Sequence, residues 1–78
     1  MSTVAMTVDY FCDKFDIEGL QEVIRHIDRD AVSHDIHWYT ISERATMMRE
    51  MRSNAVEALV IKKETSIMAA KAEKAGQQ

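Results

Sequence analysis

Residues 38–59 read WYTISERATMMREMRSNAVEAL and carry the clearest periodic pattern in the chain. Apolar side chains recur there at steps of three and four residues, which places them on one face of an α-helix. The pattern predicts a long helix over residues 34–72, followed by a frayed tail over residues 73–78. The members of this apolar stripe are Trp38, Ile41, Ala45, Met48, Met51, Ala55 and Leu59.

The start of the long helix has two candidates. Ser33 precedes the earlier one, and Thr40 heads Thr-Ile-Ser-Glu, in which Glu43 stands at the reciprocal position of a capping box. We favour the earlier start, with an irregularity near residue 40. A short strand over residues 56–61 is the weaker alternative, because Glu and Ala interrupt its run of Val, Leu and Ile.

Two shorter helices are expected before the long one. Thr7 can cap a helix over residues 7–15, and Asp16 can cap a second helix over residues 16–30. Gly19 in the second helix either costs about 1 kcal/mol of helix propensity relative to Ala or lets another backbone approach closely. The apolar positions at helical spacing are Val8, Phe11, Cys12 and Phe15, then Ile17, Leu20, Val23, Ile24 and Ile27.

The composition agrees with a single all-α domain over residues 1–78. The chain has no proline and two glycines, whereas all-β folds need frequent turn residues. We therefore expect two short N-terminal helices packed on one long C-terminal helix. A core this small is marginally stable alone, which favours association through the long helix, most simply as a homodimer.

The sequence also bears on location. The first residues, MSTVAMTV, lack both a charged start and a long apolar core, so we expect no signal segment and a cytoplasmic protein. No run approaches the roughly 18 to 20 apolar residues that a membrane span needs.

The net charge of −3 is unevenly distributed. Residues 1–40 hold eight acidic and three basic side chains, a net −5, whereas residues 41–78 hold five acidic and seven basic side chains, a net +2. Interspersed glutamates dilute the basic charge, so direct nucleic-acid binding is an alternative that we disfavour. The basic candidates are Arg44, Arg49, Arg52, Lys62 and Lys63.

The acidic half offers a further alternative, in which carboxylates imitate phosphates and occupy a nucleic-acid-binding protein. Like charges at helical spacing cost stability, although such a run usually forms a solvated face. The residues concerned are Asp9, Asp13, Asp16, Glu18 and Glu22.

We expect no metal, no cofactor and no enzymatic activity. Histidines and carboxylates cluster between residues 26 and 37, but they lack a recognisable ligand spacing and read as solvated residues near a helix junction. Cys12 beside Phe11 reads as a small apolar side chain, and no phosphate loop or nucleophile motif occurs. The cluster comprises His26, Asp30, His34, Asp35 and His37.

The long stripe predicts protein binding. Two short helices cover only part of a helix of this length, and methionines are common on surfaces that accept a partner's side chains. The candidate partner-binding residues are Trp38, Tyr39, Met48, Met51 and Leu59. We expect a small regulator or inhibitor that docks on a larger protein; by analogy, such stand-alone chains serve viruses and mobile elements against host machinery.

Three segments resemble the Hha/YmoA group of small bacterial co-regulators. They are Thr7-Val8-Asp9-Tyr10, Ile17-Glu18-Gly19-Leu20 and Tyr39-Thr40-Ile41-Ser42-Glu43-Arg44. The C-terminal part of the chain matches nothing in that group. The resemblance implies a protein that binds a nucleoid-structuring repressor and modifies silencing, with Glu43 where the group has an acidic contact residue.

Overall fold

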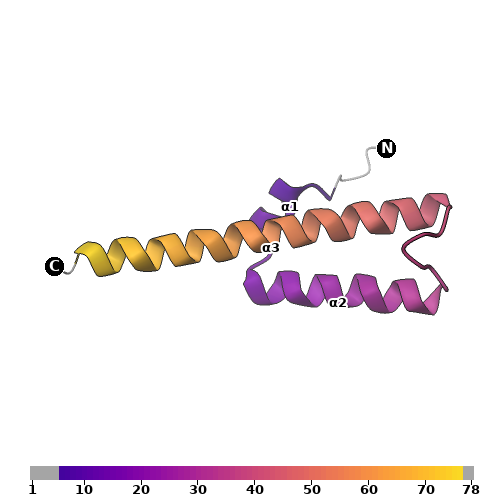
Figure 1. Cartoon of the computed structure of the whole chain (residues 1–78), viewed down its shortest axis with the longest axis horizontal. Helices are drawn as coiled ribbons and strands as arrows, with labels where there is room; N and C mark the ends of the chain where they lie inside the picture. Colours follow the sequence, from indigo (N-terminus) through magenta and orange to yellow (C-terminus); the bar gives the residue numbers. More distant parts are fainter. Residues whose placement is uncertain (1–5, 77–78) are drawn as a thin grey trace.

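The computed structural model describes residues 6–76, which form three α-helices (Figure 1). α1 spans Val8–Lys14, α2 spans Ile17–Ser33 and α3 spans Glu43–Gly76. Both short helices pack on α3, with α2 antiparallel to its N-terminal half and α1 near its middle. The predicted architecture is thus confirmed, and the weaker alternative of a strand over residues 56–61 is excluded because those residues are helical.

No helix within residues 6–76 combines the length and the apolar character that crossing a membrane requires.

The two predicted N-terminal caps are both present. The Thr7 hydroxyl accepts a hydrogen bond from the Tyr10 N–H at 3.2 Å, and an Asp16 carboxylate oxygen accepts one from the Gly19 N–H at 2.7 Å. Each bond satisfies a backbone donor that the first helical turn leaves without an intrahelical partner. α2 continues to Ser33, beyond the predicted end at residue 30.

Gly19 lies against side chains of the cap rather than against another backbone. A Cβ at this position would lie 3.0 Å from the Asp16 carboxylate oxygen and 3.3 Å from the Phe15 ring. The closest heavy atoms all belong to Asp16 and Phe15. Glycine here therefore leaves room for the capping carboxylate.

Replacing Asp16 with alanine should lower the free energy of unfolding by about 1 kcal/mol, because the Gly19 N–H loses its acceptor. Urea unfolding followed by far-ultraviolet circular dichroism measures the change. Asp16→Ser is the matched control, since serine keeps a capping oxygen and should lose only a few tenths of a kcal/mol. Equal losses in the two variants would show that the cap is not the cause.

The prediction that the long helix begins at residue 34 is wrong, because the chain reverses there. The Ile36 N–H donates to the Ala31 carbonyl at 2.8 Å and the Asp35 N–H donates to the Val32 carbonyl at 3.1 Å. Asp35 has φ 56°, the left-handed conformation that closes a Schellman motif. Glycine is the usual residue at this position, and aspartate is among the few others that tolerate it, so the stop was not apparent from the sequence.

The alternative start at Thr40 is also wrong. The Thr40 N–H donates to the His37 carbonyl, and its hydroxyl accepts from the His37 N–H, both at 2.8 Å, so this side chain closes a turn. Ser42 takes the capping position, its hydroxyl accepting from the Ala45 N–H at 3.0 Å. At the other end, α3 remains helical to Gly76 where a frayed tail was predicted; residues 77–78 lie outside the described part of the chain.

The core joins the three helices through large side chains of α1 and α2 and small ones of α3. Phe11 and Leu20 are fully buried, and they meet Ala55 and Ala58 of α3. Alanine lets the other helices approach α3 closely while large side chains fill the space between them. Partly buried neighbours complete the cluster: Val8, Tyr10, Cys12, Phe15, Val23, Ile24 and Leu59.

The predicted apolar stripe does not form one continuous face. Trp38 and Ile41 precede α3 and are 85% and 98% exposed. Within α3, the stripe's alanines are buried and its larger members, Met48, Met51 and Leu59, are only partly buried. The helix therefore packs on its neighbours mainly through its smallest apolar residues.

Candidate partner-binding surface

The connection between α2 and α3, residues 34–42, exposes large apolar side chains; we call it the loop end. Trp38 is 85% exposed, Tyr39 75% and Ile41 98%, and Val32 in the last turn of α2 is also exposed. Tryptophan and tyrosine are enriched among the residues that dominate binding energy at protein interfaces. A group of such side chains at one end of a small chain is typical of an interaction site.

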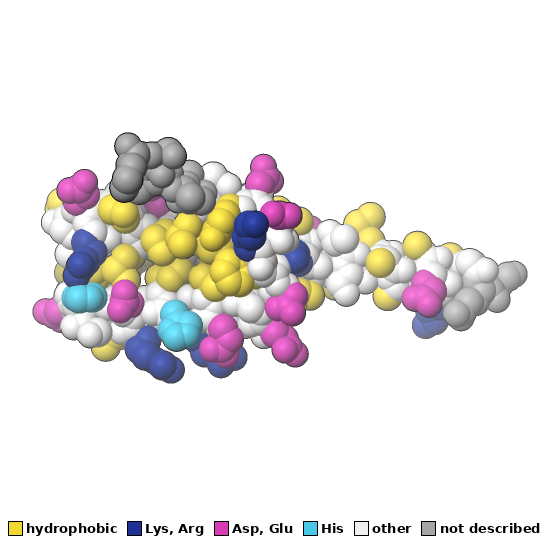
Figure 2. Space-filling view, turned by 180° about the vertical axis from the view of Figure 1, so that it is seen from behind, with side chains coloured by type: hydrophobic (Ala, Val, Ile, Leu, Met, Phe, Trp, Pro, Cys, Tyr) yellow, Lys and Arg dark blue, Asp and Glu magenta, His cyan; other side chains and the backbone are white. Residues whose placement is uncertain are grey.

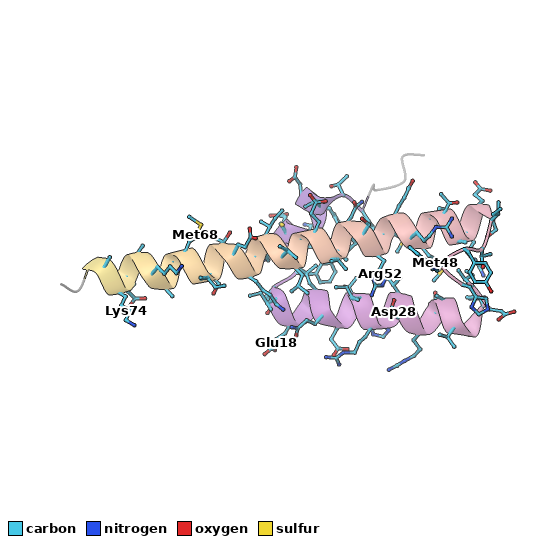
Figure 3. All side chains as sticks on the ribbon, viewed as in Figure 1. Glu18, Asp28, Met48, Arg52, Met68 and Lys74 are labelled. Carbon is cyan, nitrogen blue, oxygen red and sulfur yellow. The ribbon has the colours of Figure 1, made fainter. Side chains whose placement is uncertain are left out.

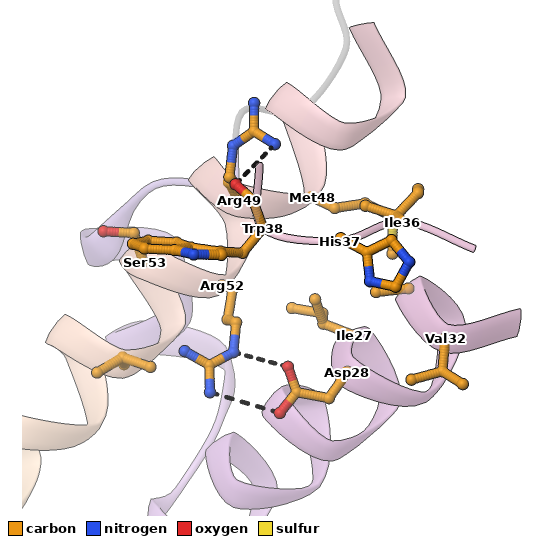
Figure 4. A pocket seen from close by; sticks show the side chains of 12 residues that line it. Ile27, Asp28, Val32, Ile36, His37, Trp38, Met48, Arg49, Arg52 and Ser53 are labelled. Carbon is orange, nitrogen blue, oxygen red and sulfur yellow. Dashed lines mark hydrogen bonds and ion pairs between the residues drawn. The ribbon is translucent and has the colours of Figure 1, made fainter. Parts of the chain in front are cut away.

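Side chains of α3 hold the backbone of the loop end in place. The Arg49 guanidinium donates to the Thr40 carbonyl at 2.7 Å. It also donates to the Trp38 carbonyl at 3.4 Å (Figure 4). The His37 and Tyr39 rings stack with their centroids 5.4 Å apart. These contacts hold the backbone that carries the exposed side chains. Binding a partner therefore loses less conformational entropy.

A groove between α2 and α3 continues from the loop end. Trp38 and Ile36 of the loop end line it, together with Ile27 of α2 and Met48 of α3 (Figure 4). Its volume is about 720 Å³. Apolar walls of this kind, next to exposed aromatic side chains, can accept an apolar side chain of a partner.

An ion pair bridges the two helices at this groove. Arg52 Nε donates to the Asp28 carboxylate at 2.7 Å (Figures 3 and 4). The hydrogen bond to Asp28 raises the pKa of Arg52 above its ordinary value. On the arginine side, this contribution to stability is lost as the pH rises past the already very high pKa of Arg52, so the guanidinium adds no pH dependence near neutrality. Since both side chains are about half exposed, the pair contributes below about 1 kcal/mol.

A second groove lies between the same two helices. Met47, Met48 and Met51 of α3 line it with Val23 of α2, and charged and histidine side chains form its rim. Figure 2 shows hydrophobic side chains gathered between the helices, bordered by histidine and charged groups. Met48 contributes to both grooves.

The predicted partner-binding residues fall in different places. Trp38 and Met48 meet at the first groove, Met51 lines the second, and Tyr39 lies in the loop end. Leu59 is partly buried against the core cluster. The sequence interpretation missed Val32, Ile36 and Val56, which also line the first groove. The apolar residues at 32, 36 and 38, set among polar ones, were the available signal.

The predicted nucleic-acid residues do not form an uncommitted basic patch. Four of the five contact other groups of the chain: Arg44 lies 2.9 Å from the His34 ring, Arg49 donates to the loop end, Arg52 pairs with Asp28, and Lys62 donates to the Phe15 carbonyl. Lys63 is exposed on α3. Four of the five basic side chains therefore take part in contacts within the fold.

The histidine and carboxylate cluster is dispersed. His34 contacts Arg44, and His37 Nε2 lies 3.3 Å from an Asp35 carboxylate oxygen. Over residues 6–76, no group of three or more potential metal ligands comes together. The acidic side chains proposed as phosphate mimics are exposed, and one of them, Asp16, serves as the α2 cap.

No protein-family model, curated protein or solved structure matches this chain. The likeness to the Hha/YmoA group therefore rests on its three short segments. Two of them are the starts of α1 and α2, and the third joins the loop end to α3. Helix-start sequences are similar in unrelated proteins because few residues make good caps.

Proposed function

We propose that this chain is a small non-enzymatic regulator that docks its loop end on a larger protein. The observation that carries the proposal is the exposure of Trp38, Tyr39 and Ile41 on a backbone that Arg49 holds in place. Burying these side chains against a partner removes a large apolar area from water at a small ordering cost.

The proposal extends to the two grooves and to α3. Met48 and Met51 would line sites for the partner's side chains, while Leu59 would act indirectly by supporting the core. Self-association as a homodimer through α3 is part of the proposal. A cytoplasmic inhibitor encoded by a virus or mobile element fits this description by analogy alone.

A second candidate is a co-regulator that reaches DNA through a bound repressor. Glu43 favours it, because this acidic residue is exposed in the first turn of α3, directly beside the loop end. Both candidates use the same surface and differ in the partner. Direct contact with DNA is not proposed, since most of the basic candidates are engaged within the chain.

Affinity capture from the lysate of the native host, with and without nuclease, tests the proposal. We expect a stoichiometric protein that survives nuclease and is lost from the Trp38→Ala variant. Ile67→Ala is the matched control, because this side chain is also large, apolar and exposed but lies far along α3. Material that disappears on nuclease treatment, or that both variants retain equally, would contradict docking at the loop end.

A further inference from the structure

The C-terminal part of α3 extends past both other helices, and we call residues 61–76 the α3 tail. Figure 1 shows it projecting from the body, and Figure 3 places Met68 and Lys74 on different sides of it. Every residue from 63 to 76 is exposed. A helix of about 15 residues is marginal in water by itself, so a surface that covers the tail would stabilise it.

One face of the α3 tail carries no charged side chain. Its members recur at steps of four and three residues, the spacing of a seam between two paired helices. Ile61 and Met68 are the large members, and Met68 is 69% exposed. We call this face the tail seam, and it consists of Ile61, Thr65, Met68, Ala72 and Ala75.

We propose that the tail seam pairs antiparallel with the tail seam of a second copy of this chain. The two-fold axis passes near Met68, so Ile61 of each copy lies opposite Ala75 of the other. The proposal rests on the self-association proposed above and is independent of the partner at the loop end.

The charged side chains beside the tail seam favour antiparallel pairing in this register. Glu64 and Lys71 flank the same side of the tail seam, and antiparallel pairing about Met68 brings each Glu64 within one residue, a rise of about 1.5 Å, of Lys71 of the second copy. Two-fold symmetry makes this pair twice. Parallel pairing would set each residue level with its own equivalent and would not form this pair.

The base of the tail has a hollow that fits the other end of the second copy. It lies between the start of α2 and α3, where Ile17 and Glu18 face Ile61, Thr65 and Ala69. In the proposed register the last turn of the second α3 reaches this hollow. That turn carries Ala72, Ala75 and Gly76, whose small size permits close approach.

The dimer would carry its two loop ends at opposite ends of a rod. With a rise of about 1.5 Å per residue, the two copies of Glu43 would lie about 75 Å apart along the axis. Two docking surfaces on one particle allow bivalent binding, in which the second contact benefits from the first. This arrangement suits a target that is itself repeated or dimeric.

Sedimentation equilibrium of the full chain, from about 1 μM to about 1 mM, tests the pairing. We expect a reversible dimer of micromolar Kd, because the tail interface is short compared with standard protein interfaces. Met68→Glu should raise that Kd about 30-fold or more by placing two carboxylates at the two-fold axis. Ile67→Glu is the control: the neighbouring side chain is 55% exposed and lies off the tail seam, so the dimer should persist.

The direction of pairing has its own test. Glu64→Lys should weaken the dimer by setting lysine against Lys71, and adding Lys71→Glu should restore it. In a Cys12→Ser background, Thr65→Cys chains mixed with Ala72→Cys chains should cross-link on oxidation, whereas Ala75→Cys chains should not cross-link to one another.

Four results would each overturn the proposal. They are a monomer at every concentration, a dimer unaffected by Met68→Glu, failure of the charge swap, and a cross-link at Ala75→Cys. None of these results bears on Trp38, whose variant reports separately on docking of the larger protein.

Discussion

Replacing Phe11 with alanine is expected to remove about 3–5 kcal/mol from the free energy of unfolding. Phe11 is 1% exposed, and its ring packs against Tyr10 and Phe15 with centroids 5.7 and 6.0 Å away. Deleting it leaves a cavity between α1 and α3 that alanines cannot fill. A domain of 78 residues has a total stability of roughly 4–12 kcal/mol, so this loss removes a large share.

Urea unfolding at a fixed protein concentration measures the effect, with the helical circular dichroism signal as the probe. The midpoint should fall sharply, or the variant should be unfolded before urea is added. Ile67→Ala removes a large side chain that is exposed on α3 and should change the stability by less than about 0.5 kcal/mol. A Phe11→Ala midpoint equal to that of the original chain would show that α1 does not contribute to the core.

Replacing Trp38 with alanine is expected to cost about 2–4 kcal/mol of binding free energy, or roughly a 30- to 1000-fold increase in Kd for the captured partner. The indole is 85% exposed in the free chain and stands at the rim of the first groove. A partner that covers the loop end would bury most of this ring, and alanine cannot replace the lost contact area.

Titration calorimetry with the purified partner measures the change, and the far-ultraviolet spectrum reports on the fold. The fold should be unaffected because Trp38 contributes little buried area to it. Met51 and Leu59, also predicted as anchors, are less informative because both are partly buried, and alanine at Leu59 would disturb the core. An increase in Kd of less than about threefold for Trp38→Ala would remove the loop end as the main docking surface.

The local structure was largely predictable from the sequence. Thr7 and Asp16 were expected as caps and act as caps, and α2 buries the predicted Leu20 and Ile27. These features depend on side chains within a few residues of the backbone groups they satisfy. Such short-range signals survive in almost any tertiary setting.

The candidate site was only partly predictable. Trp38 and Met48 were singled out as partner-binding residues and line the same groove. The sequence interpretation, however, placed Trp38 on a helical face with Ile41, whereas both precede α3 in the loop end. A left-handed residue at Asp35 separates α2 from that loop, and aspartate is a weaker signal for this conformation than glycine.

Short-range signals in the sequence establish that the chain is helical, where α1 and α2 begin and which face of α2 is apolar, because capping and helical periodicity act between near neighbours. The packing of the helices determines that α3 begins at Glu43, that Ala45, Ala55 and Ala58 are its buried residues, and that the loop end and the α3 tail are exposed. Burial depends on what lies opposite a side chain. Alanine is buried here because α1 and α2 bring their large side chains to it, and that meeting involves residues far apart along the chain.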